Sequence, residues 1–186
     1  MKKEIENALK HLHTNNLLLY PTDTVWGIGC DATNPEAVKK VYKLKQREDS
    51  KALICLVNSV EMLSDYVEYI PTKALPYLET TDRPTTIIYP KAKHFAPNLI
   101  AQDGSIAIRI CHTAFCQELI SEFGKPIVST SANLSGTPTA KTFKDIQPEI
   151  KNGVDYIVNL PDDNTPSTPS RIIRFDAEGK INIIRE

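Results

Sequence analysis

Short apolar runs that end at a proline restrict the fold of this chain more than any other feature of its sequence. Residues 17–20 (Leu-Leu-Leu-Tyr) are followed by Pro21, and residues 85–89 (Thr-Thr-Ile-Ile-Tyr) are followed by Pro90. The continuous apolar run 17–20 suits a strand that is buried on both faces, and the β-branched run 85–89 is also typical of a strand. Proline ends such a strand because it lacks the N–H group that a hydrogen-bonded ladder needs. The pattern is therefore typical of an α/β protein, in which helices cover the sheet.

Segments with helical periodicity lie between these runs. Asn34, Pro35 and Glu36 form a strong helix start, because Asn is a favoured cap and Pro fits the first helical position. We expect helices over residues 3–14, from 35 onward, and over 59–66, 113–123 and 142–150. We expect further strands over residues 53–57, 105–110, 126–128, 156–160, 172–175 and 181–184. No repeat or shift in composition marks a boundary, so residues 1–186 are predicted to form a single domain.

The balance of charges argues against a protein that attracts nucleic acid through its overall field. The chain has 22 basic and 23 acidic residues, and its net charge is −1. Any site for a polyanion must therefore be a local cluster of cations. The N-terminus is charged and no apolar run approaches the ~20 residues of a membrane span, so we expect a cytoplasmic protein that does not act at a membrane.

The cysteines and histidines do not form the patterns of a metal centre or a catalytic triad. Cys30, Cys55, Cys111 and Cys116 lack the C-x-x-C spacing of zinc and redox sites. We therefore expect buried, reduced thiols and no dedicated protein metal site. None of the four histidines belongs to a Ser-His-Asp pattern, so nucleophilic catalysis by a triad is not expected.

Three polar segments adjoin apolar runs, where the ligand loops of α/β proteins concentrate. Residues 21–31 carry two threonines, two aspartates and two glycines, and residues 45–51 carry three cations. Residues 129–135 carry five small polar side chains. Ordinary turns and a solvated surface face remain alternative explanations. The preferred interpretation is that the three segments form the walls of one ligand site.

Arg109 lies inside the apolar run 105–110, where an unpaired arginine would be costly. A salt bridge to a nearby acid and a clamp for an anionic ligand both remain open as explanations. The chain has neither the G-x-x-x-x-G-K-[ST] nor the G-x-G-x-x-G phosphate loop. Phosphates would therefore be held by Lys and Arg side chains and by Ser hydroxyls. Such a site works by positioning substrates and neutralising their charge.

Four segments taken together resemble the YrdC-like family in order and spacing. They are residues 20–28 (Tyr-Pro-Thr-Asp-Thr-Val-Trp-Gly-Ile), 45–53, 106–109 (Ile-Ala-Ile-Arg) and 129–136 (Ser-Thr-Ser-Ala-Asn-Leu-Ser-Gly). Residues 169–173 resemble the entry to the family's terminal strand, so the resemblance covers nearly the whole chain. The chain differs from the family's usual pattern at three places, which are Glu48, Ala52 and the segment 81–84 (Thr-Asp-Arg-Pro).

The resemblance implies a twisted open mixed sheet flanked by helices, of the YrdC-like (ribulose-phosphate-synthase-like) type, with a concave basic groove. It also implies a short, single-domain, TsaC-like threonylcarbamoyl-AMP synthase, which is a nucleotidyltransferase. Such enzymes condense L-threonine, bicarbonate and ATP, with Mg²⁺ held by the nucleotide, to threonylcarbamoyl-AMP and pyrophosphate. Downstream threonylcarbamoyl-transferase proteins use the product for the t6A modification of tRNA. A module that binds tRNA or double-stranded RNA, and a paralogue with another substrate, remain open alternatives.

The resemblance also assigns roles to individual residues of this chain. For threonine, the implied contacts are Thr22, Thr24, Arg109 and Ser131. For the nucleotide, they are Lys45, Arg47, Lys51, Ser129, Ser131, Asn133 and Ser135. The implied catalytic residues are Lys45, Arg47 and Arg109, whose charge would offset that of the departing pyrophosphate.

Overall fold

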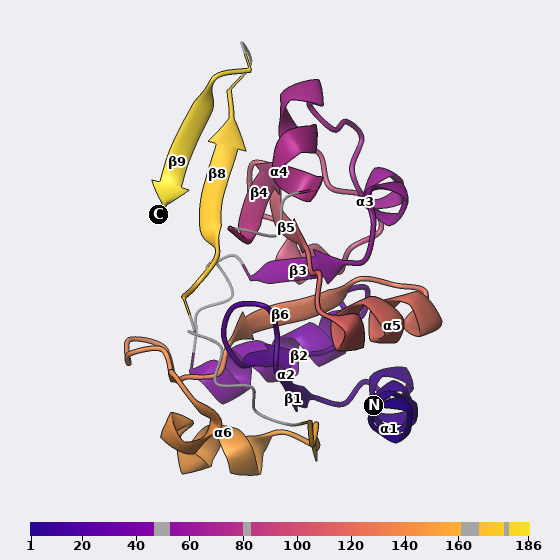
Figure 1. Cartoon of the computed structure of the whole chain (residues 1–186), viewed down its shortest axis with the longest axis vertical. Coiled ribbons are helices and arrows are strands. Elements are labelled where there is room, and N and C mark those ends of the chain that lie inside the picture. The colour runs from indigo at the N-terminus through magenta and orange to yellow at the C-terminus, as the bar shows by residue number, and fades with distance from the viewer. Residues whose placement is uncertain (47–52, 80–82, 161–167, 177–178) are drawn as a thin grey trace.

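A single mixed sheet dominates the computed structural model, which describes residues 1–46, 53–79, 83–160, 168–176 and 179–186 (Figure 1). Within these residues nine strands follow one another across the sheet in the order β7 (Tyr156–Ile157), β1 (Leu18–Tyr20), β2 (Gly27–Gly29), β6 (Ile127–Ser131), β3 (Ile54–Val57), β5 (Ile106–Ile110), β4 (Thr85–Tyr89), β8 (Arg171–Phe175) and β9 (Ile181–Arg185). Strand β3 pairs parallel with β5 and antiparallel with β6. In Figure 1, β3 and β6 lie across the view whereas β8 and β9 run along its height, so the sheet is strongly twisted. The predicted twisted mixed sheet is confirmed.

Helices cover both faces of this sheet, as the short apolar runs predict. The helices are α1 (Lys2–His13), α2 (Pro35–Lys45), α3 (Val60–Tyr66), α4 (Leu75–Glu79), α5 (Ala114–Phe123) and α6 (Pro148–Gly153). Leu18 packs in one apolar cluster with Ile5 of α1 and Phe115 of α5, and the next residue, Leu19, packs in a second cluster with Val38 of α2. Successive side chains of a strand point to opposite faces, so β1 is buried from both sides.

Caps mark helix ends at α2 and α5, and the cap at Asn34 confirms the prediction. The Asn34 side chain accepts hydrogen bonds from the backbone N–H groups of Glu36 and Ala37, at 2.9 and 3.1 Å, and so begins α2. Thr113 caps α5 in the same way, and Gly124 ends that helix with a left-handed φ of 70°. These local signals fix the ends of both helices.

Two expected elements are shorter or more broken than predicted. The single helix expected over residues 142–150 is divided into a 3₁₀ turn, Phe143–Asp145, and α6. Pro148 begins α6, because the residue before a proline is disfavoured in the helical conformation. The strand expected over 156–160 is reduced to β7, which pairs with β1 over two residues. The sequence also favours a hairpin turn at residues 177–180, between the expected strands 172–175 and 181–184, and this segment lies partly outside the described residues.

The glycines of β2 belong to the sheet, so the prediction that they stand in a ligand loop is wrong. A Cβ on Gly29 would lie 2.5 Å from the Tyr20 ring and 2.8 Å from the Val128 carbonyl oxygen. A Cβ on Gly27 would lie 2.9 Å from the Ser129 Oγ. Glycine therefore lets β2 fit between β1 and β6. The loop is confined to residues 21–26.

The 21–26 loop leads into β2, which pairs with the end of β6, so two of the polar segments lie side by side near the middle of the sheet. Residues 129–131, expected in a loop, form the last part of β6 and pair with β2 and β3. In the described part of the chain, no helix is long and apolar enough to cross a membrane.

Candidate functional site

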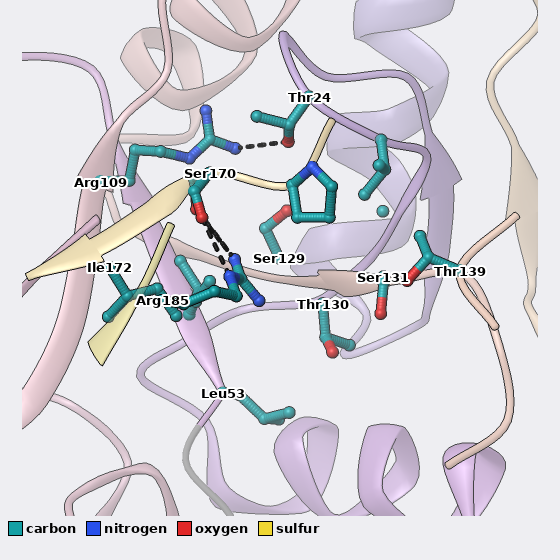
Figure 2. Close-up of a pocket in the computed structure, with 14 residues that line it drawn as sticks. Thr24, Leu53, Arg109, Ser129, Thr130, Ser131, Thr139, Ser170, Ile172 and Arg185 are labelled. Carbon is teal, nitrogen blue, oxygen red and sulfur yellow. Dashed lines mark hydrogen bonds between the residues drawn. The ribbon is translucent and has the colours of Figure 1, made fainter. Parts of the chain in front are cut away.

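A pocket of about 180 Å³ lies between the 21–26 loop, the central strands and the C-terminal strands (Figure 2). Its described walls include two arginines and six hydroxyl side chains, and they contain no acidic residue. The lining residues are Thr24, Val25, Gly27, Leu53, Ile54, Arg109, Ser129, Thr130, Ser131, Thr139, Pro169, Ser170, Ile172 and Arg185. A wall with cations and hydroxyls and without carboxylates suits an anionic ligand.

The 21–26 loop supplies Thr24, which is only 8% exposed. The Thr22 hydroxyl donates to the Val25 carbonyl oxygen at 2.8 Å and lies 3.0 Å from the Thr24 hydroxyl. The Thr24 backbone N–H donates to the Thr22 Oγ1 at 3.1 Å. Thr22 therefore does not line the described pocket but holds the turn that presents Thr24 to it.

Arg109 forms the salt bridge that its sequence position leaves open, and it also lines the pocket, where its role as an anion clamp stays a prediction. Its guanidinium pairs with the Asp23 carboxylate, and the side chains of Arg109 and Asp23 are 4% and 15% exposed. Its Nη2 donates to the Thr24 hydroxyl at 3.3 Å, and the side chain lines the pocket. Burial alone would lower the pKa of Arg109, but the nearby Cys111 and Asp23 outweigh burial and raise it. Arg109 is therefore a cation that lines the pocket and already forms an ion pair with an internal acid, Asp23.

Lys45 lies at the end of α2 and is 1% exposed. Its ammonium group donates to the carbonyl oxygens of Ser131 and Asn133, the latter at 2.6 Å. The backbone N–H of Ser135 donates back to the Lys45 carbonyl at 2.9 Å. Lys45 thus fixes the end of β6 and the turn that follows, and it does not line the described pocket. Its predicted contact with phosphate stays a prediction.

Asn133 and Ser135 lie behind the pocket wall. The Asn133 amide nitrogen donates to the carbonyl oxygens of Leu134 and Thr137, at 3.0 and 2.8 Å, and so closes the turn. The Asn133 Oδ1 and the Ser135 Oγ are buried and have no hydrogen-bond partner within the described residues. Ser129 and Ser131, in contrast, line the pocket directly. Arg47 and Lys51 lie outside the described residues.

Ser170 and Arg185 were missed by the sequence-based prediction of site residues. The Ser170 hydroxyl lies 2.7 Å from the Thr86 hydroxyl, and the Arg185 guanidinium donates to the Ser170 carbonyl oxygen at 2.7 and 3.0 Å (Figure 2). Burial lowers the pKa of Arg185, and the positive charge of Arg109 lowers it further by a smaller amount. Among the described residues, no carboxylate forms an ion pair with Arg185. Within the described residues, the charge of Arg185 is therefore not neutralised by an acidic side chain, in contrast to the charge of Arg109.

The sequence carried a signal for one of these two residues. The resemblance had already singled out the segment 169–173, which begins with Pro169 and Ser170. Arg185 offered no such signal, because its place at the pocket depends on the pairing of β9 with β8, whose register shifts between Ile172 and Ile173. Thr130, which belongs to the predicted polar segment 129–135 but had no role of its own, lines the pocket as well, and so does Thr139, which was not predicted.

The four cysteines are buried and free, as expected. A hydrogen bond with Cys116 lowers the pKa of the Cys111 thiol to about 7, and the charge of Arg109 acts in the same direction against burial. Burial raises the pKa of Cys55. In the described part of the chain, no three His, Cys, Asp or Glu side chains are grouped so that they could hold a metal ion.

The sequence profile of the Sua5, YciO and YrdC family, described as telomere recombination, matches residues 10–186. A threonylcarbamoyl-AMP synthase of Vibrio campbellii is 34% identical over 182 residues, which cover 92% of this chain and 98% of that protein. This similarity thus extends over nearly the full length of both proteins.

Solved structures share the fold. The crystal structure of P. abyssi Sua5 complexed with L-threonine has a TM-score of 0.84 and 24% identity, and the match covers 97% of this chain and 53% of that one. The crystal structure of E. coli YciO has a TM-score of 0.82 and 20% identity, and it covers 100% of this chain and 90% of that one. At these identities the structures establish the common fold alone.

Proposed function

Since the chain belongs to the Sua5, YciO and YrdC family, we propose that it is a threonylcarbamoyl-AMP synthase, a nucleotidyltransferase. One observation carries the proposal: a pocket whose described walls hold two arginines, six hydroxyl side chains and no acid lies in a chain that is 34% identical to such a synthase over nearly its whole length. The reaction would join L-threonine, bicarbonate and ATP to give threonylcarbamoyl-AMP, pyrophosphate and water.

The chemistry explains why the pocket needs cations and hydroxyls. The threonine amine adds to CO₂ derived from bicarbonate and loses a proton, which gives a carbamate. A carbamate oxygen then attacks the α-phosphorus of ATP, and the bond to pyrophosphate breaks. The threonine carboxylate, the carbamate and the phosphates are all anionic. Arg109 and Arg185 would therefore hold these groups together and reduce their mutual repulsion.

The size of the pocket favours a division between the two substrates. Its volume of about 180 Å³ is below the roughly 300–1,000 Å³ of sites for drug-sized ligands. We therefore assign the described pocket to threonine, with Thr24, Arg109 and Ser131 as its contacts and Thr22 as their support. The nucleotide would reach beyond it toward the turn after β6. Its proposed contacts are Ser129, Ser131, Asn133, Ser135, Arg47 and Lys51.

In this proposal Lys45 supports the nucleotide site from below, whereas the resemblance implies a direct contact with the phosphates. Its ammonium group holds two carbonyl oxygens at the end of β6, so we propose that it keeps Ser131 in place and adds positive charge beneath the nucleotide. Arg47 and Lys51 would neutralise the outer phosphates. Magnesium enters as part of the substrate, held by the phosphates of ATP, where it would screen the charge of the departing pyrophosphate.

We further propose that the protein works in the cytoplasm and passes its product to downstream transferases that modify tRNA. Threonylcarbamoyl-AMP is a mixed anhydride, which makes the carbamoyl group an acceptor for an amine nucleophile. We propose that the consuming reaction transfers that group to an amine. Direct contact with tRNA would be a separate property, and its affinity would fall steeply with salt concentration.

The proposal is tested by pyrophosphate release in the presence of ATP, Mg²⁺ and bicarbonate, with and without L-threonine. We expect release that depends on threonine and on bicarbonate. Release that is the same without threonine, or that appears only with another amino acid, would contradict the proposal. Serine and allo-threonine serve as matched substrate controls. Serine lacks only the methyl group of threonine, and allo-threonine differs only in its configuration at Cβ.

A further inference from the structure

Three donors from one short segment converge on the carboxylate of Asp23. Arg109 forms an ion pair with Oδ1, the Cys111 thiol donates to the same oxygen at 3.4 Å, and the His112 backbone N–H donates to Oδ2 at 3.3 Å. Asp23 is the middle residue between Thr22 and Thr24. One carboxylate therefore ties the 21–26 loop to the end of β5.

The sheet itself does not make this connection. Strands β2 and β5 are separated by β6 and β3 in the sheet order, so no ladder hydrogen bond joins the 21–26 loop to β5. The loop must cross the ends of the intervening strands, and the contacts of Asp23 hold it there. The relative position of Thr24 and Arg109 thus depends on a side-chain interaction and not on the backbone of the sheet.

Arg109 is held at both terminal nitrogens by neighbouring residues of the loop. Nη1 pairs with Asp23 and Nη2 donates to the Thr24 hydroxyl at 3.3 Å. Nε is buried and has no hydrogen-bond partner within the described residues. Asp23 is therefore the one charged group of the described chain that pairs with this guanidinium.

We propose that Asp23 is the positioning residue that aims Arg109 at the carboxylate of threonine; this inference rests on the proposed function. Asp23 is absent from the pocket lining whereas Arg109 and Thr24 line it, so Asp23 acts through Arg109. Because Arg109 is 4% exposed, water cannot replace the lost acid, and the guanidinium must turn away to find another partner.

A different role for Asp23 would give the opposite result. If Asp23 only reduced the charge of Arg109, its removal would leave a stronger cation at the pocket and tighten threonine binding. If Asp23 positions Arg109, its removal weakens threonine binding although the charge at the pocket increases. The direction of the change in the KM for threonine therefore separates the two roles.

The experiment compares Asp23→Asn and Asp23→Glu with a matched control, Asp31→Asn. Asp31 is a similarly buried acid, 7% exposed at its side chain, that pairs with Lys125 at 3.1 Å and does not line the pocket. For each variant, kcat and the KM values for threonine and ATP are measured by pyrophosphate release, together with thermal unfolding. Loss of one charge-assisted hydrogen bond predicts a rise of about tenfold in the KM for threonine of Asp23→Asn.

We expect the KM for ATP of Asp23→Asn to stay close to that of the wild type, and Asp23→Glu to recover most of the affinity for threonine. Asp31→Asn should unfold at lower temperature and keep both KM values. An unchanged or lowered KM for threonine in Asp23→Asn would overturn the inference. So would parallel rises in both KM values, or the same rise in Asp31→Asn.

A milder variant keeps the test open if Asp23→Asn does not fold. Cys111→Ala removes one weak donor from the Asp23 carboxylate and should raise the KM for threonine by about threefold, with no change for ATP. Equal KM values in Cys111→Ala and the wild type would count against the inference. If the wild type itself shows no threonine-dependent release, the proposed function fails, and that outcome is recognised before any variant is compared.

Discussion

Alanine substitutions at the two glycines of β2 separate the requirements of the sheet from those of the pocket. In Gly29→Ala, the new methyl group meets the Tyr20 ring at 2.5 Å and the Val128 carbonyl oxygen at 2.8 Å. The carbonyl belongs to the neighbouring strand β6 and cannot move without disturbing the ladder. In Gly27→Ala, the nearest atom is the Ser129 Oγ at 2.9 Å, and the next lies at 3.5 Å. A serine hydroxyl can rotate away.

The two variants should therefore differ in stability. Overpacking typically costs about 1–3 kcal/mol, and Gly29→Ala should reach the upper end because backbone must shift. In Gly27→Ala, the smaller clash is offset by about 0.4–1 kcal/mol from the reduced entropy of the unfolded chain. At roughly 2–4 °C per kcal/mol for a chain of this size, Gly29→Ala should unfold roughly 6–12 °C below the wild type and Gly27→Ala within a few degrees of it.

Activity should change in the opposite order. Gly27 and Ser129 both line the pocket, so the added methyl group and the rotated hydroxyl alter the space assigned to the substrates. Gly27→Ala should lose at least about tenfold in kcat/KM for threonine while it stays folded, whereas Gly29→Ala should keep its activity at temperatures where it is folded. Thermal unfolding and pyrophosphate release measure the two effects. Equal stability of the two variants, or full activity of Gly27→Ala, would refute the reasoning.

Three further predictions concern charged side chains. Arg185→Gln should lower kcat/KM by about tenfold, because it removes a pocket cation that has no acidic partner among the described residues. Its unfolding temperature should fall by only a few degrees, because the residue as a whole is exposed although its guanidinium is partly buried and loses the hydrogen bonds to the Ser170 carbonyl oxygen; wild-type kinetics would contradict this. Lys45→Met should lower both activity and stability, because the carbonyl oxygens of Ser131 and Asn133 lose a shared charged donor; a variant that is fully active would show that Lys45 does not organise the site. Hydrogen bonds lower the pKa of Asp103 to about 2, which is below its value in the unfolded chain, and the bond from Ser105 contributes more than the bond from Arg174. The ionised Asp103 therefore stabilises the fold fully above about pH 4, and this stabilisation is lost as the pH falls toward 2. Because Asp103 is 56% exposed, Asp103→Asn should cost less than about 1 kcal/mol at pH 7, and denaturant titrations should show this difference shrinking between pH 4 and pH 2.

Local sequence signals predicted the parts of the fold that depend on local interactions. Most of the run at residues 17–20 forms β1, a strand buried on both faces, and Asn34 caps its helix, because hydrophobic burial and capping are encoded within a few residues. The sequence leaves two explanations open for Arg109, and the salt bridge to an acid is confirmed, whereas the clamp for an anion stays a prediction, although Arg109 lines the pocket. These predictions required no knowledge of how distant segments meet.

Features that depend on pairing between distant strands could not be predicted in this way. Gly27 and Gly29 look like loop residues in the sequence, and only the neighbouring β1 and β6 make them necessary in a strand. Arg185 reaches the pocket because β9 folds back along β8, with a register shift that no local pattern indicates. The turn of Lys45 toward two carbonyl oxygens depends likewise on a segment nearly ninety positions away.

In the proposed function, the described pocket and the region beyond it toward the turn after β6 join threonine, CO₂ and the α-phosphate of ATP in one product. The most direct measurement is mass spectrometry of the reaction with ¹³C-bicarbonate, L-threonine, ATP and Mg²⁺. We predict a species with the mass of threonylcarbamoyl-AMP that carries one ¹³C atom, requires all three substrates and decreases strongly in Arg109→Ala. Turnover of ATP without this labelled product, or the same yield from Arg109→Ala, would contradict the claim.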